Sequence, residues 1–304
     1  MPDSLLPISK TTFIGPFEVG RLAYGCWRFS GSTVAGATVK IEAALEIGAN
    51  LVDTAAIYGF GDEGFGAAEA VLGDVYAANA RLREKTVLVT KGGIHPPVPY
   101  DSRASNLIDS CEGSLARLKS DVIDVFLVHR PDLLASYDEV AEALTQLRAA
   151  GKIREAGVSN FSHTQIRALQ SKLDFALVAN QPEFSPLAIE PLEDGTLDIA
   201  QEMNLAVMAW SPLGGGRLTA THQPEAGTQE ARVLSVLDSI ATRESVGVDH
   251  VALAWVLAHP AVSMALIGTQ NVDRIKDSAK AYDVKLSRQD WYDVLVAARG
   301  VSMP

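Results

Sequence analysis

Short apolar runs alternate with longer amphipathic segments along most of this chain. The runs are rich in aliphatic residues, as in strands buried on both faces of a parallel sheet, and they cover residues 21–24, 51–52, 87–89, 122–128, 156–158, 177–179, 206–209 and 264–267. Between them, apolar residues spaced about 3.6 apart predict helices over 39–47, 67–78, 106–118, 137–149, 165–171, 196–203 and 230–246. Strands and helices that alternate in this way predict an α/β fold, a closed (β/α)8 TIM barrel.

The segment ends and the start of the chain refine this prediction. Gly48 and Gly151 stand where helix C-caps belong, and Asn160 and Ser162 are candidate N-caps for the helix near 165. Residues 12–14 and 17–19 flank Gly15-Pro16 and predict an N-terminal β-hairpin. An open doubly wound sheet is disfavoured because no G-x-G-x-x-G follows the first strand. No Pro-, Gly- or Ser-rich linker divides residues 1–304, which we expect to form a single domain.

Charge limits the partners that the protein can have. The formal net charge is −11, and an acidic chain repels nucleic-acid phosphates and anionic lipid, so we expect no nucleic acid and no membrane among its partners. The uncharged stretch 251–272 is long enough to cross a bilayer. Because His259-Pro260 interrupts it, we predict a buried helix over 251–258 and then the strand at 264–267. The oligomeric state does not follow from the sequence.

Cysteine usage bears on location and on metal binding. Cys26 and Cys111 are far apart, and no C-x-x-C spacing indicates zinc or redox chemistry, so we expect no metal. Two isolated thiols are typical of a reducing compartment. Residues 1–10 have neither the basic nor the apolar region of a secretory signal. These features predict a cytoplasmic location.

Polar side chains end three successive strands of the predicted barrel. Asp53, Lys91 and His129 are 38 residues apart in each step, and Tyr58 follows Asp53 on the next loop. Because chemistry in a TIM barrel collects at the carboxyl ends of its strands, we expect these four side chains to converge. Taken singly, the Asp could be a helix cap, the Lys solvated, the His structural and the Tyr a pocket wall.

Together the four groups suit proton transfer to a carbonyl oxygen. We expect Lys91 and Asp53 to form an ion pair, and the ammonium to lower the pKa of Tyr58 from its ordinary ~10. Tyr58 could then act as general acid while hydride reaches the carbonyl carbon. His129 could donate a hydrogen bond that orients the same oxygen.

Several stretches of the chain carry a family resemblance. They are residues 48–59 and 69–73, Lys91-Gly92-Gly93, residues 128–132 and 157–161, Asn180-Gln181 and residues 210–216. In this order they resemble the signatures of the aldo-keto reductases, and residues 129–132 with 209–218 are similar to the bacterial YdhF-like oxidoreductases. The resemblance covers the chain from about Arg21 to its end. It implies an NADP(H)-dependent oxidoreductase that transfers hydride between the nicotinamide and a small aldehyde or ketone.

The resemblance also implies roles for individual positions. Asp53, Tyr58, Lys91 and His129 match the catalytic tetrad, with Tyr58 as general acid. The positions that match the cofactor site are Ser159, Asn160 and Gln181 for the carboxamide, Trp210 for stacking on the nicotinamide, Ser211, Leu213, Gly215 and Arg217 for the pyrophosphate loop, and Gly268, Thr269, Gln270 and Arg274 for the 2′-phosphate segment. Trp27 and Tyr100 are candidate substrate-pocket residues.

Two departures from the family pattern affect the cofactor. The family often has a Lys where this chain has Gly268, and Asp277-Ser278 stands where a Glu-Asn pair is usual. The first change removes a cation from the 2′-phosphate site, so the expected preference for NADP(H) over NAD(H) is weaker than usual. Arg274 alone can still form a bidentate phosphate contact.

Two other functions stay open from the sequence. Lys91 could form a Schiff base in a lyase, although pairing with Asp53 would keep it protonated and a poor nucleophile. The chain could also be a nucleotide-sensing, non-catalytic binding subunit, because a fold does not fix a function.

Overall fold

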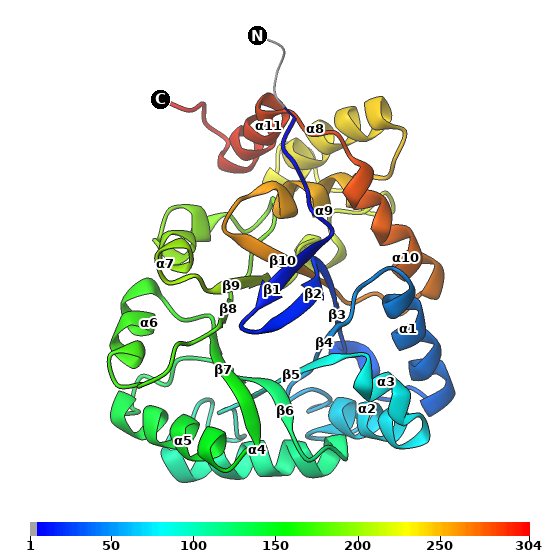
Figure 1. Ribbon diagram of the computed structural model, residues 1–304. Helices are drawn as coiled ribbons and strands as arrows, with labels where there is room; N and C mark the ends of the chain where they lie inside the picture. The colour runs from blue at the N-terminus through cyan, green and yellow to red at the C-terminus, as the bar shows by residue number, and fades with distance from the viewer. Residues whose placement is uncertain (1–4) are drawn as a thin grey trace.

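Eight parallel strands close into a barrel in the computed structural model, which describes residues 5–304 (Figure 1). The first four residues of the 1–10 segment discussed above lie outside the described part. The barrel strands are β3 (Leu22–Gly25), β4 (Leu51–Asp53), β5 (Val87–Gly92), β6 (Ile123–Val128), β7 (Ile153–Ser159), β8 (Ala179–Gln181), β9 (Ala206–Ala209) and β10 (Val262–Ile267). They follow the chain order, and β10 pairs with both β9 and β3 to close the ring. The predicted (β/α)8 barrel is confirmed.

Helices surround the ring of strands (Figure 1). They are α1 (Val34–Glu46), α2 (Ala67–Ala78), α3 (Ala80–Glu84), α4 (Ala104–Leu118), α5 (Tyr137–Ala149), α6 (His163–Gln170), α7 (Thr196–Met203), α8 (Gln229–Glu244), α9 (Val248–Ala258), α10 (Val272–Asp277) and α11 (Arg288–Arg299). No helix within residues 5–304 is long and apolar enough to cross a membrane. The uncharged stretch from 251 is divided between α9 and β10, as predicted.

Two apolar cores result from the alternation of side chains along each strand. Side chains two residues apart point to the same face. One set, including Leu51, Val89 and Leu127, fills the barrel interior. The other set, including Val52, Leu88 and Phe126, packs outward against the helices. The inward set fixes the direction of the polar residues that follow it at the strand ends.

The predicted N-terminal hairpin is confirmed and covers one end of the barrel. Strands β1 (Thr11–Ile14) and β2 (Phe17–Gly20) pair antiparallel across Gly15, whose φ of +52° suits glycine. Ile14 and Val19 are buried in the interior core, so the hairpin closes the end at which the strands begin (Figure 1). The polar cluster of Asp53, Tyr58, Lys91 and His129 lies at the opposite end, where the strands finish.

Some predicted boundaries were wrong. Helix α6 begins one residue after Ser162, whose hydroxyl accepts from the Gln165 backbone N–H in a capping box, so Asn160 is not the cap. Strand β8 covers Ala179–Gln181 rather than 177–179. Helices α3, α10 and α11 were not predicted, although α11 buries Trp291, Val294, Leu295 and Ala298 at helical spacing.

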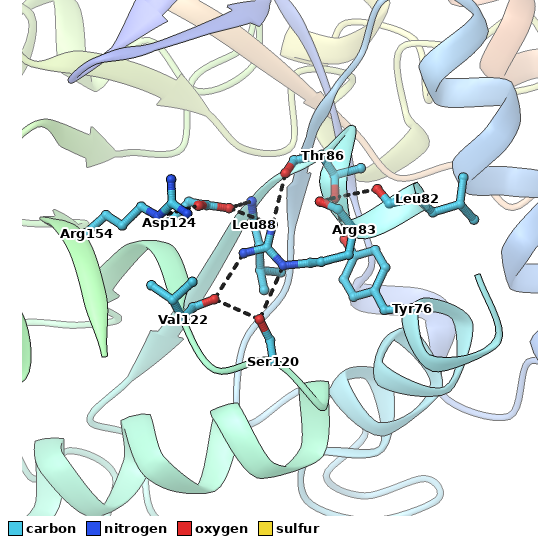
Figure 2. A network of polar contacts seen from close by, with 9 residues as sticks. All are labelled: Tyr76, Leu82, Arg83, Thr86, Leu88, Ser120, Val122, Asp124 and Arg154. Carbon is cyan, nitrogen blue, oxygen red and sulfur yellow. Dashed lines mark hydrogen bonds and ion pairs between the residues drawn. The ribbon is translucent and has the colours of Figure 1, made fainter. Parts of the chain in front are cut away.

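A buried carboxylate, shown with its partners in Figure 2, ties β5 and β6 together near their amino ends. Asp124 is 4% exposed and accepts a hydrogen bond from the Leu88 backbone N–H at 2.8 Å. It also pairs with Arg83 at 2.9 Å and Arg154 at 3.4 Å. The Arg83 guanidinium donates further to the carbonyl oxygens of Thr86 and Val122. Because the buried carboxylate is paired and hydrogen-bonded, removing it would leave its partners at this end of the barrel uncompensated.

Removing the carboxylate should therefore destabilise the fold without affecting the opposite end. We predict that Asp124→Ala lowers the free energy of unfolding by about 2–3 kcal/mol, because it leaves one buried N–H and two arginines without their partner. Urea unfolding measures this loss. The control is Asp74→Ala, which breaks an ion pair with Lys119 in which both side chains are about half exposed, and which should cost less than about 1 kcal/mol. Equal losses for the two variants would contradict the assigned role.

Candidate active site

The centre of the polar cluster is the ammonium of Lys91, near the end of β5. The side chain is fully buried. Its Nζ donates to Asp53 Oδ2 at 2.7 Å, to the Thr54 carbonyl oxygen at 2.8 Å and to Tyr58 Oη at 3.1 Å. A lysine ammonium has only three protons to donate, so all of them are committed. This arrangement fixes the position of the charge.

Asp53 is held on both of its carboxylate oxygens. Oδ2 accepts from Lys91, and Oδ1 accepts from the side-chain amide of Gln181 at 2.9 Å. Burial alone would lower the pKa of Lys91, but the negative charge of Asp53 and the hydrogen bonds to Asp53 and Tyr58 raise it above its ordinary value. Lys91 is therefore a permanent cation at neutral pH.

The inward direction of these side chains follows from the strands. Asp53 lies two residues after Leu51, Lys91 two after Val89, and His129 two after Leu127, and these three apolar residues line the barrel interior. Strands β4, β5 and β6 are neighbours in parallel register. The three polar residues consequently meet at the end of the barrel where the strands finish, as the sequence predicted.

The pKa of Tyr58 differs from the expectation. Burial is the larger effect and raises the pKa of the phenol above its ordinary value, whereas the Lys91 ammonium lowers it. Asp53 also raises it, because its negative charge disfavours a nearby phenolate. The predicted lowering was wrong, because burial outweighs the ammonium and the phenol is held in its protonated form.

His129 packs edge-on against Tyr58, with ring centroids 5.9 Å apart and an interplanar angle of 80°. Burial lowers its pKa well below the ordinary value, and the cations of Lys91 and Arg130 lower it further. The imidazole is therefore neutral at pH 7. Within residues 5–304 its Nδ1 is buried and has no hydrogen-bond partner.

A chain of hydrogen bonds connects the polar residues at the ends of β7 and β8 with the residue after β9. The Trp210 indole N–H donates to Asn160 Oδ1 at 2.9 Å, and the Asn160 amide donates to Ser159 Oγ at 2.8 Å. The Ser159 hydroxyl in turn donates to the Gln181 carbonyl oxygen at 2.9 Å. The structure thus brings these four predicted residues together, beside the Lys91 cluster.

The predicted pyrophosphate loop follows β9 and has an irregular backbone. Ser211 and Gly215 have φ of +50° and +71°, and Leu213 packs against the outer core. The Arg217 guanidinium donates to the Gly214 carbonyl oxygen at 2.7 Å and to Glu230 at 2.5 Å. The position of Arg217 is therefore set by the protein itself.

The segment after β10 lies against β3. The Tyr24 hydroxyl donates to the Thr269 carbonyl oxygen at 3.1 Å, and the Gln270 amide donates to the Tyr24 hydroxyl at 3.4 Å. Asn271 caps α10, and the side chain of Arg274 is exposed on its first turn. The predicted pocket residues Trp27 and Tyr100 are 61% and 39% exposed, on the segments that follow β3 and β5.

Two residues beside the cluster were not predicted to have a role. Thr54 supplies the backbone oxygen that takes the third proton of Lys91. The Arg130 guanidinium lies 5.7 Å from the centre of the Trp210 ring. The available signals for Arg130 were its position directly after His129 and its place in the stretch 129–132 that carries the family resemblance. Within the described residues no group of three His, Cys, Asp or Glu side chains could hold a metal ion.

Comparisons with known proteins find matches over most of the chain. The model described as "Aldo/keto reductase family" matches residues 21–295. A 6-dehydroglucose reductase of Novosphingobium aromaticivorans is 49% identical, with 94% of both chains covered. Oxidoreductase YdhF of Escherichia coli is 36% identical over 95% of this chain and 97% of its own. The crystal structure of a thermostable aldo-keto reductase with the inhibitor epalrestat superposes with a TM-score of 0.81, at 25% identity, over 94% of this chain and 99% of that one.

The lowered pKa of His129 predicts a loss of stability in mild acid. An unfolded imidazole takes up a proton as the pH falls through about 6.5, whereas the folded site resists protonation. The unfolded state then binds more protons, so the free energy of unfolding falls by up to about 1.4 kcal/mol per pH unit below this value. Urea unfolding at about pH 7 and about pH 5.5 should show a loss that is about 1 kcal/mol larger for the unmodified protein than for His129→Asn. Equal losses would refute a buried neutral imidazole.

Proposed function

Because the chain belongs to the aldo/keto reductase family and is a reductase enzyme of that kind, we propose that it reduces an aldehyde or ketone to the alcohol with NADP(H), and that Tyr58 is the general acid. The observation that carries the proposal is the 3.1 Å hydrogen bond from the Lys91 ammonium to the Tyr58 oxygen. A cation fixed at this distance stabilises the phenolate that forms when the proton leaves.

The residues of the site fit a nicotinamide dinucleotide. The amide and hydroxyl groups of Ser159, Asn160 and Gln181 can donate to and accept from a carboxamide, and the flat ring of Trp210 beside them offers a stacking face. Gly215 and Gly216 leave open space around an irregular backbone, where N–H groups suit phosphate oxygens. When bound, the cofactor supplies the hydride.

Each residue of the tetrad then has a distinct task. Tyr58 keeps its proton until the carbonyl oxygen gains charge, because burial holds its pKa high. Lys91 compensates the phenolate, and Asp53 keeps Lys91 charged and in place. His129 is neutral and donates one hydrogen bond to the substrate oxygen. This hydrogen bond orients the substrate, and His129 does not compete with Tyr58 as the acid.

For the substrate, we propose a small hydroxyl-rich aldehyde of the sugar type. The relative named 6-dehydroglucose reductase is 49% identical over nearly the whole length of both chains. Arg130 supports the proposal from this chain's own geometry, because its guanidinium lies over Trp210 next to His129. A guanidinium carries five donors, and several hydroxyl groups can accept from it.

A Schiff-base lyase is disfavoured by the same geometry. The Lys91 nitrogen is fully buried and uses all three protons in hydrogen bonds. A nucleophilic amine needs a free lone pair, and the raised pKa of Lys91 opposes it.

We also propose a cytoplasmic, reducing setting. Cys26 and Cys111 are both buried free thiols. Burial raises the pKa of Cys26 well above its ordinary value and that of Cys111 to about 12, so neither is poised for oxidation chemistry.

The general-acid role predicts a selective loss in Tyr58→Phe. Turnover of an aldehyde should fall by about 10²–10⁴-fold, because the phenolic proton is lost, while the Kd of NADPH changes by less than about twofold, since the ring is retained. NADPH absorbance and a binding titration measure the two quantities. Tyr137→Phe, at a half-buried tyrosine on α5, is the matched control and should keep its turnover. A Tyr58→Phe protein with unchanged turnover would remove Tyr58 from this role.

The proposed substrate class predicts a preference among aldehydes. We expect kcat/KM for 6-dehydroglucose to exceed that for hexanal, an aldehyde of similar length without hydroxyl groups, by at least about tenfold, because a polar site discriminates against a partner that cannot hydrogen-bond. NADPH consumption measures both rates. A higher kcat/KM for hexanal would exclude a site built for sugars while leaving the reductase function intact.

A further inference from the structure

Glu69, on the first turn of α2, is a fully buried carboxylate that has no part in the proposed reaction. Each of its oxygens accepts a hydrogen bond from a different element. The Thr90 hydroxyl on β5 donates to Oε1 at 2.5 Å, and the Arg117 guanidinium on α4 donates through Nε to Oε2 at 2.8 Å. A buried charge whose oxygens are both committed is fixed by its partners. Glu69 therefore joins α2, α4 and β5 at a single point.

The contact of Glu69 on β5 is at the residue directly before Lys91. Val89 points into the barrel interior, so Lys91 points inward as well and Thr90 points outward to the helices. Thr90 is also fully buried. The hydrogen bond between Thr90 and Glu69 therefore holds the outer face of the strand beside the residue that carries the central ammonium.

The backbone completes a ring of contacts that includes Tyr58. Two residues before Tyr58, the Ala56 N–H donates to the Lys91 carbonyl oxygen at 3.0 Å. Ten residues after Tyr58, the Ala68 N–H in the first turn of α2 donates to the Tyr58 carbonyl oxygen at 3.2 Å. Glu69 is the next residue, and its side chain returns to β5. Tyr58 is thus held between β5 and the start of α2, and the Glu69 side chain fixes these two elements to each other.

Arg117 holds the same region from the side of α4. Its side chain is 25% exposed, so its ion pair with Glu69 is largely shielded from water. The guanidinium lies 5.5 Å from the ring centre of Phe65, on the loop that leads from Tyr58 to α2. Gly66 leaves the room for this approach, since a Cβ there would lie 2.4 Å from Arg117 Cδ. The loop that follows the phenol therefore packs on the cation that Glu69 holds.

We propose that Glu69 is a positioning residue, which sets the distance between the Lys91 ammonium and the Tyr58 phenol and thereby the rate of proton transfer. The proposal rests on the general-acid role proposed above for Tyr58. The Lys91–Tyr58 hydrogen bond is 3.1 Å long, and a displacement of about 1 Å at a reacting group costs on the order of 10²-fold in rate. Glu69 acts through Thr90 and the first turn of α2.

The test removes the Glu69–Thr90 contact from each side in turn in the full-length protein. Glu69→Ala should lower kcat for an aldehyde by about tenfold or more, and Thr90→Val, which keeps the branched shape and leaves Glu69 paired with Arg117, by about fivefold. Glu69→Gln should recover most of the loss, because its amide oxygen still accepts from Thr90. The Kd of NADPH should change by less than about twofold in each variant. NADPH absorbance measures kcat, and calorimetric titration measures the Kd.

Two further readouts distinguish positioning from a purely structural role. The solvent deuterium isotope effect on kcat should rise in Glu69→Ala and in Thr90→Val, because proton transfer from Tyr58 becomes a larger part of the barrier. The double variant Glu69→Ala/Thr90→Val should lose no more kcat than Glu69→Ala alone, since both changes remove the same contact.

Asp124→Ala is the matched control. Asp124 is also a buried carboxylate that pairs with arginine and holds β5, through the Leu88 N–H. Its removal should keep kcat and the isotope effect unchanged despite the lower stability. Far-UV circular dichroism at the assay temperature confirms that each variant is folded, and Thr90→Val tests the inference even where Glu69→Ala does not fold.

The outcomes separate this inference from the proposed function. A folded Thr90→Val protein with unchanged kcat would overturn the inference, as would a fall in kcat without a rise in the isotope effect. An equal loss of kcat in Asp124→Ala would also overturn it, because the loss would then follow stability rather than position. In each of these cases an inactive Tyr58→Phe protein leaves the general-acid role in place, whereas an active one refutes the proposed function itself.

Discussion

The site depends on one buried charge, the ammonium of Lys91. A lone ammonium without contact to water is strongly destabilising unless it is paired and its protons are hydrogen-bonded. Asp53 supplies the opposite charge, and the Thr54 backbone and the Tyr58 oxygen take the other two protons. The hydrogen bonds that stabilise the Lys91 ammonium also fix the position of the Tyr58 phenol. The stability of the buried charge and the geometry of proton transfer therefore depend on the same contacts.

The barrel meets this requirement by its topology. Neighbouring parallel strands deliver Asp53, Lys91 and His129 to one end, and Gln181 reaches Asp53 from β8 on the other side of the interior. The opposite end is closed by the hairpin and tied by Asp124 and its arginines. Polar groups that stabilise the fold and polar groups that suit chemistry are therefore at opposite ends of the strands, and changes at one end need not alter the other.

Much of this arrangement could be predicted from the sequence, because parallel strands bring their last residues together whatever the loops do. The eight apolar runs and the polar residues ending three of them were sufficient for the barrel and for the convergence of Asp53, Lys91, His129 and Tyr58. The direction in which the pKa of Tyr58 shifts could not be predicted, because it depends on how far burial outweighs the Lys91 charge. The contacts of Arg28 with Gly268 and of Lys40 with Gln270 could not be predicted either, because more than two hundred residues separate the partners along the chain.

Neutron diffraction on crystals exchanged into heavy water would test the central claim most directly, because it locates the protons on the three groups. We predict three deuterons on Lys91 Nζ, directed at Asp53 Oδ2, the Thr54 carbonyl oxygen and Tyr58 Oη, with a deuteron retained on the Tyr58 oxygen and a single one on the His129 ring. Two deuterons on Nζ, or a bare phenolate in the protein without ligands, would contradict the account.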